Sequence, residues 1–68
     1  MNLILNGEAR ELPDGATVAD AVRASGMPAL ARGVAVAVDR EVVPGSRWDT
    51  TQLRDGQRIE VLQAVQGG

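Results

Sequence analysis

Residues 17–28 read TVADAVRASGMP and predict one short helix over residues 18–25. The Thr17 hydroxyl can accept a hydrogen bond from the first turn of this helix, and the Asp20 carboxylate can reach back toward Thr17, as in a capping box. The apolar residues that follow recur at the three- and four-residue spacing of one helix face. Gly26 is of the residue type that most often ends a helix.

Strands are predicted on both sides of this helix. Before it, an apolar run over residues 2–6 stops at Asn6-Gly7, the strongest two-residue hairpin signal, and a polar strand follows over residues 8–12. After it, residues 34–38 read VAVAV, and this alternation predicts a strand with one side toward the core. A tight turn then leads into a short strand at residues 41–43.

The last part of the chain completes the fold prediction. An irregular connection runs from Pro44 through Trp48, whose ring we expect over the edge of the sheet. Residues 58–62 form a final strand. This order of elements is that of the β-grasp (ubiquitin-like) fold of the α+β class, a mixed sheet of about five strands with one main helix on one face. We therefore expect a β-grasp domain over residues 1–62 and a flexible tail over residues 63–68.

Composition excludes several classes of function. A chain of 68 residues forms one domain without room for a deep catalytic cleft. Its cations are all arginines, scattered along the chain, and Trp48 is its sole aromatic residue, so we expect no nucleic-acid partner. The chain has no cysteine and no histidine, and no acidic cluster has ligand spacing, so we expect neither a metal site nor catalysis of its own.

Signals for membranes or secretion are not found in this sequence. No apolar run approaches the roughly 20 residues needed to cross a bilayer. The first residues, MNLIL, lack the positive charge and the long apolar stretch of a signal peptide. We expect a cytoplasmic protein that has no membrane partner and is monomeric on its own.

Alternation along the strands assigns residues to the two sides of the sheet. The side that faces the helix should hold Met1, Leu3, Leu5, Val34, Val36, Val38, Ile59 and Val61. The open side should hold Ile4, Ala35, Ala37 and Leu62, which we expect to be neighbours in a small apolar patch beside the tail. Such a patch suits the docking of a protein partner.

The ending and several internal motifs resemble a known family. The residues concerned are the run VAVDREVVP at 36–44, Trp48 shortly after it, Asp55-Gly56, and the terminal Val65-Gln66-Gly67-Gly68. Together with the element order, they resemble the ubiquitin-like sulfur carriers over the whole chain, and most closely the ThiS family of thiamine biosynthesis. The stretch from Pro44 to Trp48 favours this family over the small subunit of molybdopterin synthase, which shares the Gly-Gly end.

The resemblance implies a protein that is a substrate and carrier, not an enzyme. A ThiF-like adenylyltransferase would use ATP and Mg²⁺ to adenylate the carboxylate of Gly68. A persulfide donor would then convert this group to a thiocarboxylate, and a ThiG-like thiazole synthase would accept the sulfur. The carrier itself would bind no cofactor.

A Gly-Gly tail suits this chemistry. Residues 63–68 can extend over about 20 Å, far enough to bring Gly68 into a partner's nucleotide site. Val65, Gln66 and Gly67 would enter the same channel, which a residue without Cβ passes most easily. An α-carboxyl has a pKa of about 3.3–3.7 and is therefore ionised at neutral pH.

Two alternatives stay open. The same tail chemistry would serve delivery of sulfur to molybdopterin or to another acceptor. A ubiquitin-like interaction module with an inert tail would share the fold, but its function would not depend on Gly68.

Overall fold

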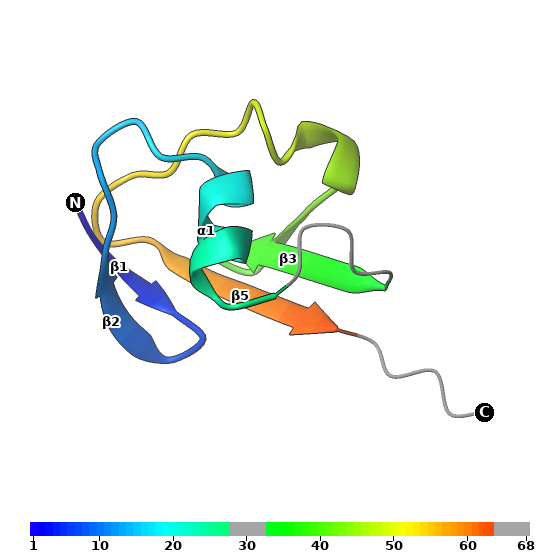
Figure 1. Ribbon diagram of the computed structural model, residues 1–68, viewed down its shortest axis with the longest axis horizontal. Helices are drawn as coiled ribbons and strands as arrows, with labels where there is room; N and C mark the ends of the chain where they lie inside the picture. Colours follow the sequence, from blue (N-terminus) through cyan, green and yellow to red (C-terminus); the bar gives the residue numbers. More distant parts are fainter. Residues whose placement is uncertain (28–32, 64–68) are drawn as a thin grey trace.

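The computed structural model describes residues 1–27 and 33–63, which form one sheet with a helix packed on it (Figure 1). The elements are β1 (Asn2–Leu5), β2 (Glu8–Glu11), α1 (Val18–Ala24), β3 (Val34–Val38), β4 (Glu41–Val43), the 3-10 helix η1 (Gly45–Arg47) and β5 (Arg58–Gln63). Each predicted strand and the predicted helix is present, with ends that differ from the prediction by no more than one residue. The irregular connection after Pro44 contains the short helix η1.

The sheet has the topology expected of a β-grasp fold. Its strand order is β2-β1-β5-β3-β4, so the last strand lies at the centre. Strands β1 and β5 are parallel, with Leu5 opposite Ile59, and the other neighbouring strands are antiparallel. The start of β1 and the end of β5 therefore lie at opposite ends of the sheet (Figure 1).

Helix α1 begins at the predicted capping box. The Thr17 hydroxyl accepts from the backbone N–H of Asp20 at 3.4 Å, and the Asp20 carboxylate accepts from the backbone N–H of Thr17 at 2.9 Å. A cap of this kind contributes about 1 kcal/mol. The helix ends at Ala24, and Gly26 follows with a φ of 85°, a conformation that glycine adopts without strain.

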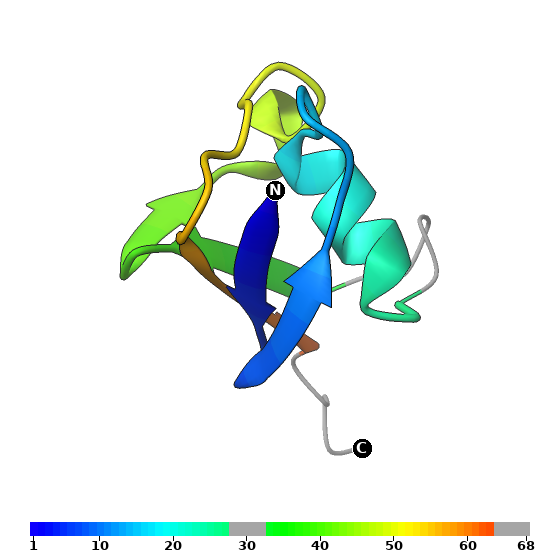
Figure 2. The ribbon, with the colours of Figure 1, turned by 90° about the vertical axis from the view of Figure 1, so that its left-hand side faces the viewer.

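The core lies between α1 and one face of the sheet (Figure 2). Its buried members are Leu3, Leu5, Val18, Ala21, Val22, Val36, Val38, Leu53, Ile59 and Val61. The assignment of the inner side was therefore confirmed for Leu3, Leu5, Val36, Val38, Ile59 and Val61. Met1 and Val34 also pack against this core, as predicted, but they are only partly buried, because Met1 precedes β1 and Val34 is the first residue of β3.

Two tight turns connect the paired strands. In the first, Asn6 and Gly7 have φ of 50° and 81°, and in the second, Asp39 and Arg40 have φ of 49° and 72°. Positive φ at both central residues is the pattern of hairpin turns whose twist matches that of the flanking strands. Asn and Asp tolerate this conformation better than most residues, which explains their place at the head of each turn.

Candidate functional site

The described part of the tail region ends inside β5. This strand runs to Gln63, one residue beyond its predicted end, and stays paired with β3, where Ala35 lies opposite Leu62 and Val34 opposite Gln63. The predicted tail residues Val65, Gln66, Gly67 and Gly68 lie outside the described residues. The structure therefore defines the base from which the tail departs and the surface around that base.

Beside this base lies a small apolar surface on the side of the sheet away from the helix. Leu62 is 62% exposed and Val42 is 75% exposed, and these are the two most exposed large apolar side chains described. Ala35 lies opposite Leu62, and Ala37 lies opposite Val42 on the other neighbouring strand. We call Ala35, Ala37, Val42 and Leu62 the apolar patch.

Val42 was missed in the sequence prediction of this surface. Its direction could have been found from the predicted tight turn after Val38, because a two-residue turn pairs Ala37 with Val42 and so places both on the same side of the sheet. The patch consequently extends over β5, β3 and β4.

Ile4 does not join this patch. It lies opposite Ala9 on β2 and opposite Arg58 on β5, and it is only half-buried. Arg58 and Leu62 are four residues apart along β5, which corresponds to about 13 Å. The expected contact between Ile4 and Leu62 is therefore wrong, because the register between β1 and β5 brings Ile4 to the other end of the central strand.

The end of the outer surface near Ile4 is charged. Asp39, Arg40, Arg58 and Glu60 line a pocket of about 380 Å³. Asp39 accepts from the backbone N–H of Arg58 at 3.0 Å and from the side-chain amide of Gln57 at 3.3 Å. Within residues 1–27 and 33–63, neither Arg40 nor Arg58 forms an ion pair. Both side chains are exposed, so this end of the outer surface carries two positive charges.

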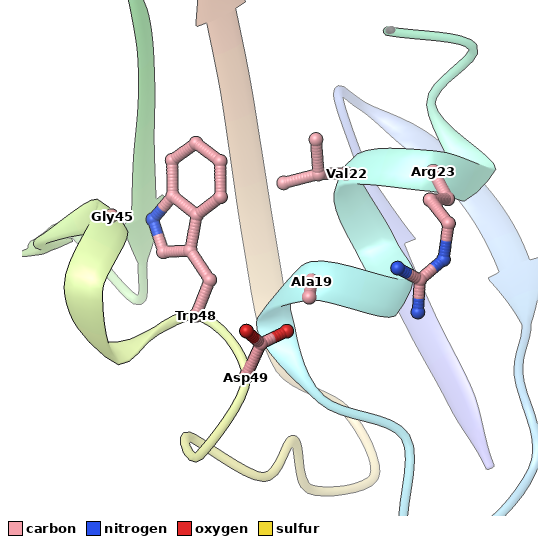
Figure 3. A pocket seen from close by; sticks show the side chains of 6 residues that line it. All are labelled: Ala19, Val22, Arg23, Gly45, Trp48 and Asp49. Atoms are coloured by element: carbon pink, nitrogen blue, oxygen red, sulfur yellow. The ribbon is translucent and has the colours of Figure 1, made fainter. Parts of the chain in front are cut away.

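Trp48 lies on the helix side of the molecule. Its Nε1 donates to the backbone oxygen of Val43 at 2.9 Å, and its ring is partly buried against the core. The ring borders a pocket of about 360 Å³ whose other lining residues are Ala19, Val22, Arg23, Gly45 and Asp49 (Figure 3). Trp48 thereby ties the connection after β4 to the sheet edge, as its sequence position predicted.

The pKa of the Asp20 carboxyl is shifted at the start of helix α1. The pKa of the Asp20 carboxyl is lowered, first by the hydrogen bond from the Thr17 backbone and then by the Arg23 side chain, which also forms an ion pair with it. This shift belongs to a helix cap. The described ranges contain no group of three or more His, Cys, Asp or Glu side chains that could hold a metal ion. In these ranges no helix is long and apolar enough to span a membrane.

Comparison with known proteins agrees with the geometry. The model of the ThiS family matches residues 3–68. A crystal structure of the thiamine biosynthesis protein ThiS from Geobacter metallireducens is 30% identical, with a TM-score of 0.79 and full coverage of both chains. An NMR solution structure of a thiamine biosynthesis protein from the same organism is 28% identical, with a TM-score of 0.77, covering 100% of this chain and 88% of that one.

A sequence search of curated proteins gave no match. The assignment therefore depends on the family match, which includes nearly the whole chain, and on the shared fold. The structural match over the full length of both chains agrees with the β-grasp strand order. The chain belongs to the ThiS family, the sulfur carriers of thiamine biosynthesis.

Proposed function

We propose that this chain carries sulfur as a thiocarboxylate on its C-terminal Gly68 and delivers it to a thiazole synthase. The observation that supports this most directly is the position of the central strand. β5 leads from the middle of the sheet to Gln63, beside the apolar patch, and the sequence then continues to Gly67-Gly68. A partner that covers the patch would have the terminal carboxylate within reach.

The reaction would take place on partners. A carboxylate oxygen of Gly68 attacks the α-phosphate of ATP held with Mg²⁺ by a ThiF-like adenylyltransferase, and pyrophosphate leaves. The terminal sulfur of a persulfide donor then displaces AMP from the acyl carbon. A thiol must break the resulting S–S bond, which leaves the thiocarboxylate whose sulfur a ThiG-like synthase accepts. ATP-dependent adenylation suits a cytoplasmic location.

The length of the tail fits this scheme. Residues 64–68 span at most about 17 Å when fully extended. Such a segment can carry the terminus into a buried nucleotide site while the sheet remains outside. Glycine at positions 67 and 68 removes the Cβ atoms that would obstruct a narrow channel close to the reacting atoms.

The adenylating partner would dock on the apolar patch. Apolar contact with Leu62 and Val42 would exclude water, and carboxylates of the partner would face Arg40 and Arg58 at the charged end. Leu62→Asp should weaken binding at least about tenfold in calorimetry, as expected for loss of a central apolar contact. Ala9→Asp adds the same charge on the exposed strand β2 and serves as the matched control. Equal affinities for the two variants would contradict this docking surface.

The decisive experiment measures the intact mass of the chain. We would incubate it with its cognate adenylyltransferase, ATP, Mg²⁺ and a sulfur source, and compare it with a chain lacking Gly68. We expect a gain equal to the replacement of one oxygen by sulfur on the terminal peptide of the full chain alone. An unchanged mass beside an active adenylyltransferase would favour an interaction module with an inert tail. Transfer of the sulfur to a thiazole synthase, tested in the same mixture, distinguishes this acceptor from molybdopterin synthesis.

A further inference from the structure

We propose that Asn6 is a positioning residue that fixes the end of β5 and thereby the direction in which the tail leaves the sheet. This inference rests on the proposed carrier function. The Asn6 side-chain oxygen accepts a hydrogen bond from the backbone N–H of Val61 at 2.8 Å. The backbone N–H of Asn6 donates to the oxygen of Ile59 at 2.9 Å. One turn residue thus contacts β5 at two successive points.

These contacts extend the parallel pairing beyond the end of β1. The register of β1 with β5 ends where Leu5 lies opposite Ile59, whereas β5 continues to Gln63. Beyond this point the Asn6 side chain accepts the hydrogen bond that a next residue of β1 would otherwise accept from the backbone N–H of Val61. The residue Val61 is only 3% exposed, so this N–H needs a partner within the protein. Strand β3 holds the other edge over the same residues. The tail therefore starts from a strand that is fixed on both sides close to its last described residue.

The site of this contact makes it relevant to the reaction. Val61 stands two residues before Gln63, and residues 64–68 can extend about 17 Å beyond it. A change in the direction of the strand end would therefore change where the path of the tail to a partner's nucleotide site begins. A misplacement of about 1 Å in a reacting group can lower a rate about 100-fold.

Space for such a change exists next to Asn6. A pocket of about 370 Å³ opens between the first turn and β5, lined by Asn6, Gly7, Arg58, Glu60, Val61 and Leu62. Without the side-chain bond, the end of β5 could move toward this pocket, and water could reach the N–H of Val61. The fold would survive because the core contacts of Val61 and Ile59 face the helix.

Asp39 supplies a matched internal control. It also stands at the head of a two-residue turn with positive φ, and it also accepts from a backbone N–H of β5, that of Arg58, at 3.0 Å. Its bond holds the start of β5, far from the tail. Glycine adopts positive φ readily, so Asn6→Gly and Asp39→Gly should each keep the turn and remove only the side-chain bonds.

The test measures pyrophosphate release by the cognate adenylyltransferase, with ATP, Mg²⁺, a persulfide donor and a thiol present and the full-length carrier as variable substrate. We expect Asn6→Gly to lower kcat about 10-fold to 100-fold, with a smaller change in KM, because the body still docks while the carboxylate is misplaced. Asn6→Asp keeps an acceptor oxygen at the same position and should restore most of the rate. Asp39→Gly should keep the wild-type kcat, and any change should appear in KM, because Asp39 lines the charged pocket at the proposed docking surface. Hydrogen exchange at the Val61 amide should accelerate in Asn6→Gly alone.

Two outcomes would overturn the inference alone: an Asn6→Gly variant with the kcat of the wild type, or an Asp39→Gly variant whose kcat falls as much as that of Asn6→Gly. A wild-type chain that forms no acyl-adenylate with an active adenylyltransferase would instead overturn the proposed function, and this inference with it. The wild-type reaction in each series therefore separates the two failures.

Discussion

On the central strand β5, Ile59 is 0% exposed and Val61 3% exposed, whereas Leu62 is 62% exposed. The first two belong to the face that packs on α1, and Leu62 belongs to the open face near the end of β5. One strand therefore packs on the core through one set of side chains and exposes an apolar side chain on the other side, which we propose contacts the partner. The comparison predicts that substitutions on the core face lower the free energy of unfolding much more than substitutions on the open face.

Truncation of Ile59 should have the largest effect. Ile59→Ala removes a fully buried side chain from the core and should lower the free energy of unfolding by about 2–5 kcal/mol. Urea denaturation measures this directly. Glu60→Ala, one residue further and exposed, should change the same quantity by less than about 0.5 kcal/mol. Similar losses for the two variants would mean that the faces do not divide the roles of β5.

The fold could be predicted from the sequence because its signals are local. The capping box of Thr17 and Asp20, the Asn6-Gly7 turn and the alternation of VAVAV each act within a few residues. Together with the element order they suffice for the β-grasp layout. The observed strand ends differ from the predicted ones by one residue because they depend on how far the neighbouring strand continues. Gln63, for example, still pairs with Val34 on β3.

The candidate site was less predictable because it depends on pairing between distant segments. Alternation correctly assigned Ala35, Ala37 and Leu62 to the outer side, but it could not show that Ile4 pairs with Arg58. The hydrogen bond from Val61 to Asn6 connects residues 55 positions apart. Turn preference alone accounts for an asparagine before glycine, so the sequence carried no further sign of that bond.

Removal of the indole hydrogen bond should have an intermediate effect. Trp48→Phe keeps an aromatic ring against the core but loses the bond from Nε1 to the Val43 oxygen, which should cost about 1 kcal/mol. Thermal unfolding followed by circular dichroism measures the change. Val42→Ala alters the exposed residue next to Val43 on β4 and should leave the unfolding temperature almost unchanged. Equal stability of Trp48→Phe and the wild type would show that this bond does not hold the connection.

Acidification should reveal a smaller contribution from the helix cap. The Thr17 N–H and the Arg23 side chain lower the pKa of Asp20 in the folded state below its ordinary value of 3.8. The stability from this carboxylate is therefore complete above the ordinary value and is lost as the pH falls through the lowered folded value. Urea denaturation from neutral pH to below 3.8 should show a steeper loss for the wild type than for Asp20→Asn. Parallel pH curves would contradict this role.

The smallest effect on stability is expected on the open face. Leu62→Thr removes an apolar side chain that is already 62% exposed and replaces it with a residue that suits a strand. The free energy of unfolding should change by less than about 0.5 kcal/mol. Affinity for the adenylating partner should nevertheless fall, because Leu62 is the patch residue that stands next to the base of the tail. A large loss of stability would show instead that Leu62 supports the fold. Its apolar side chain would then be explained by stability, without a binding partner.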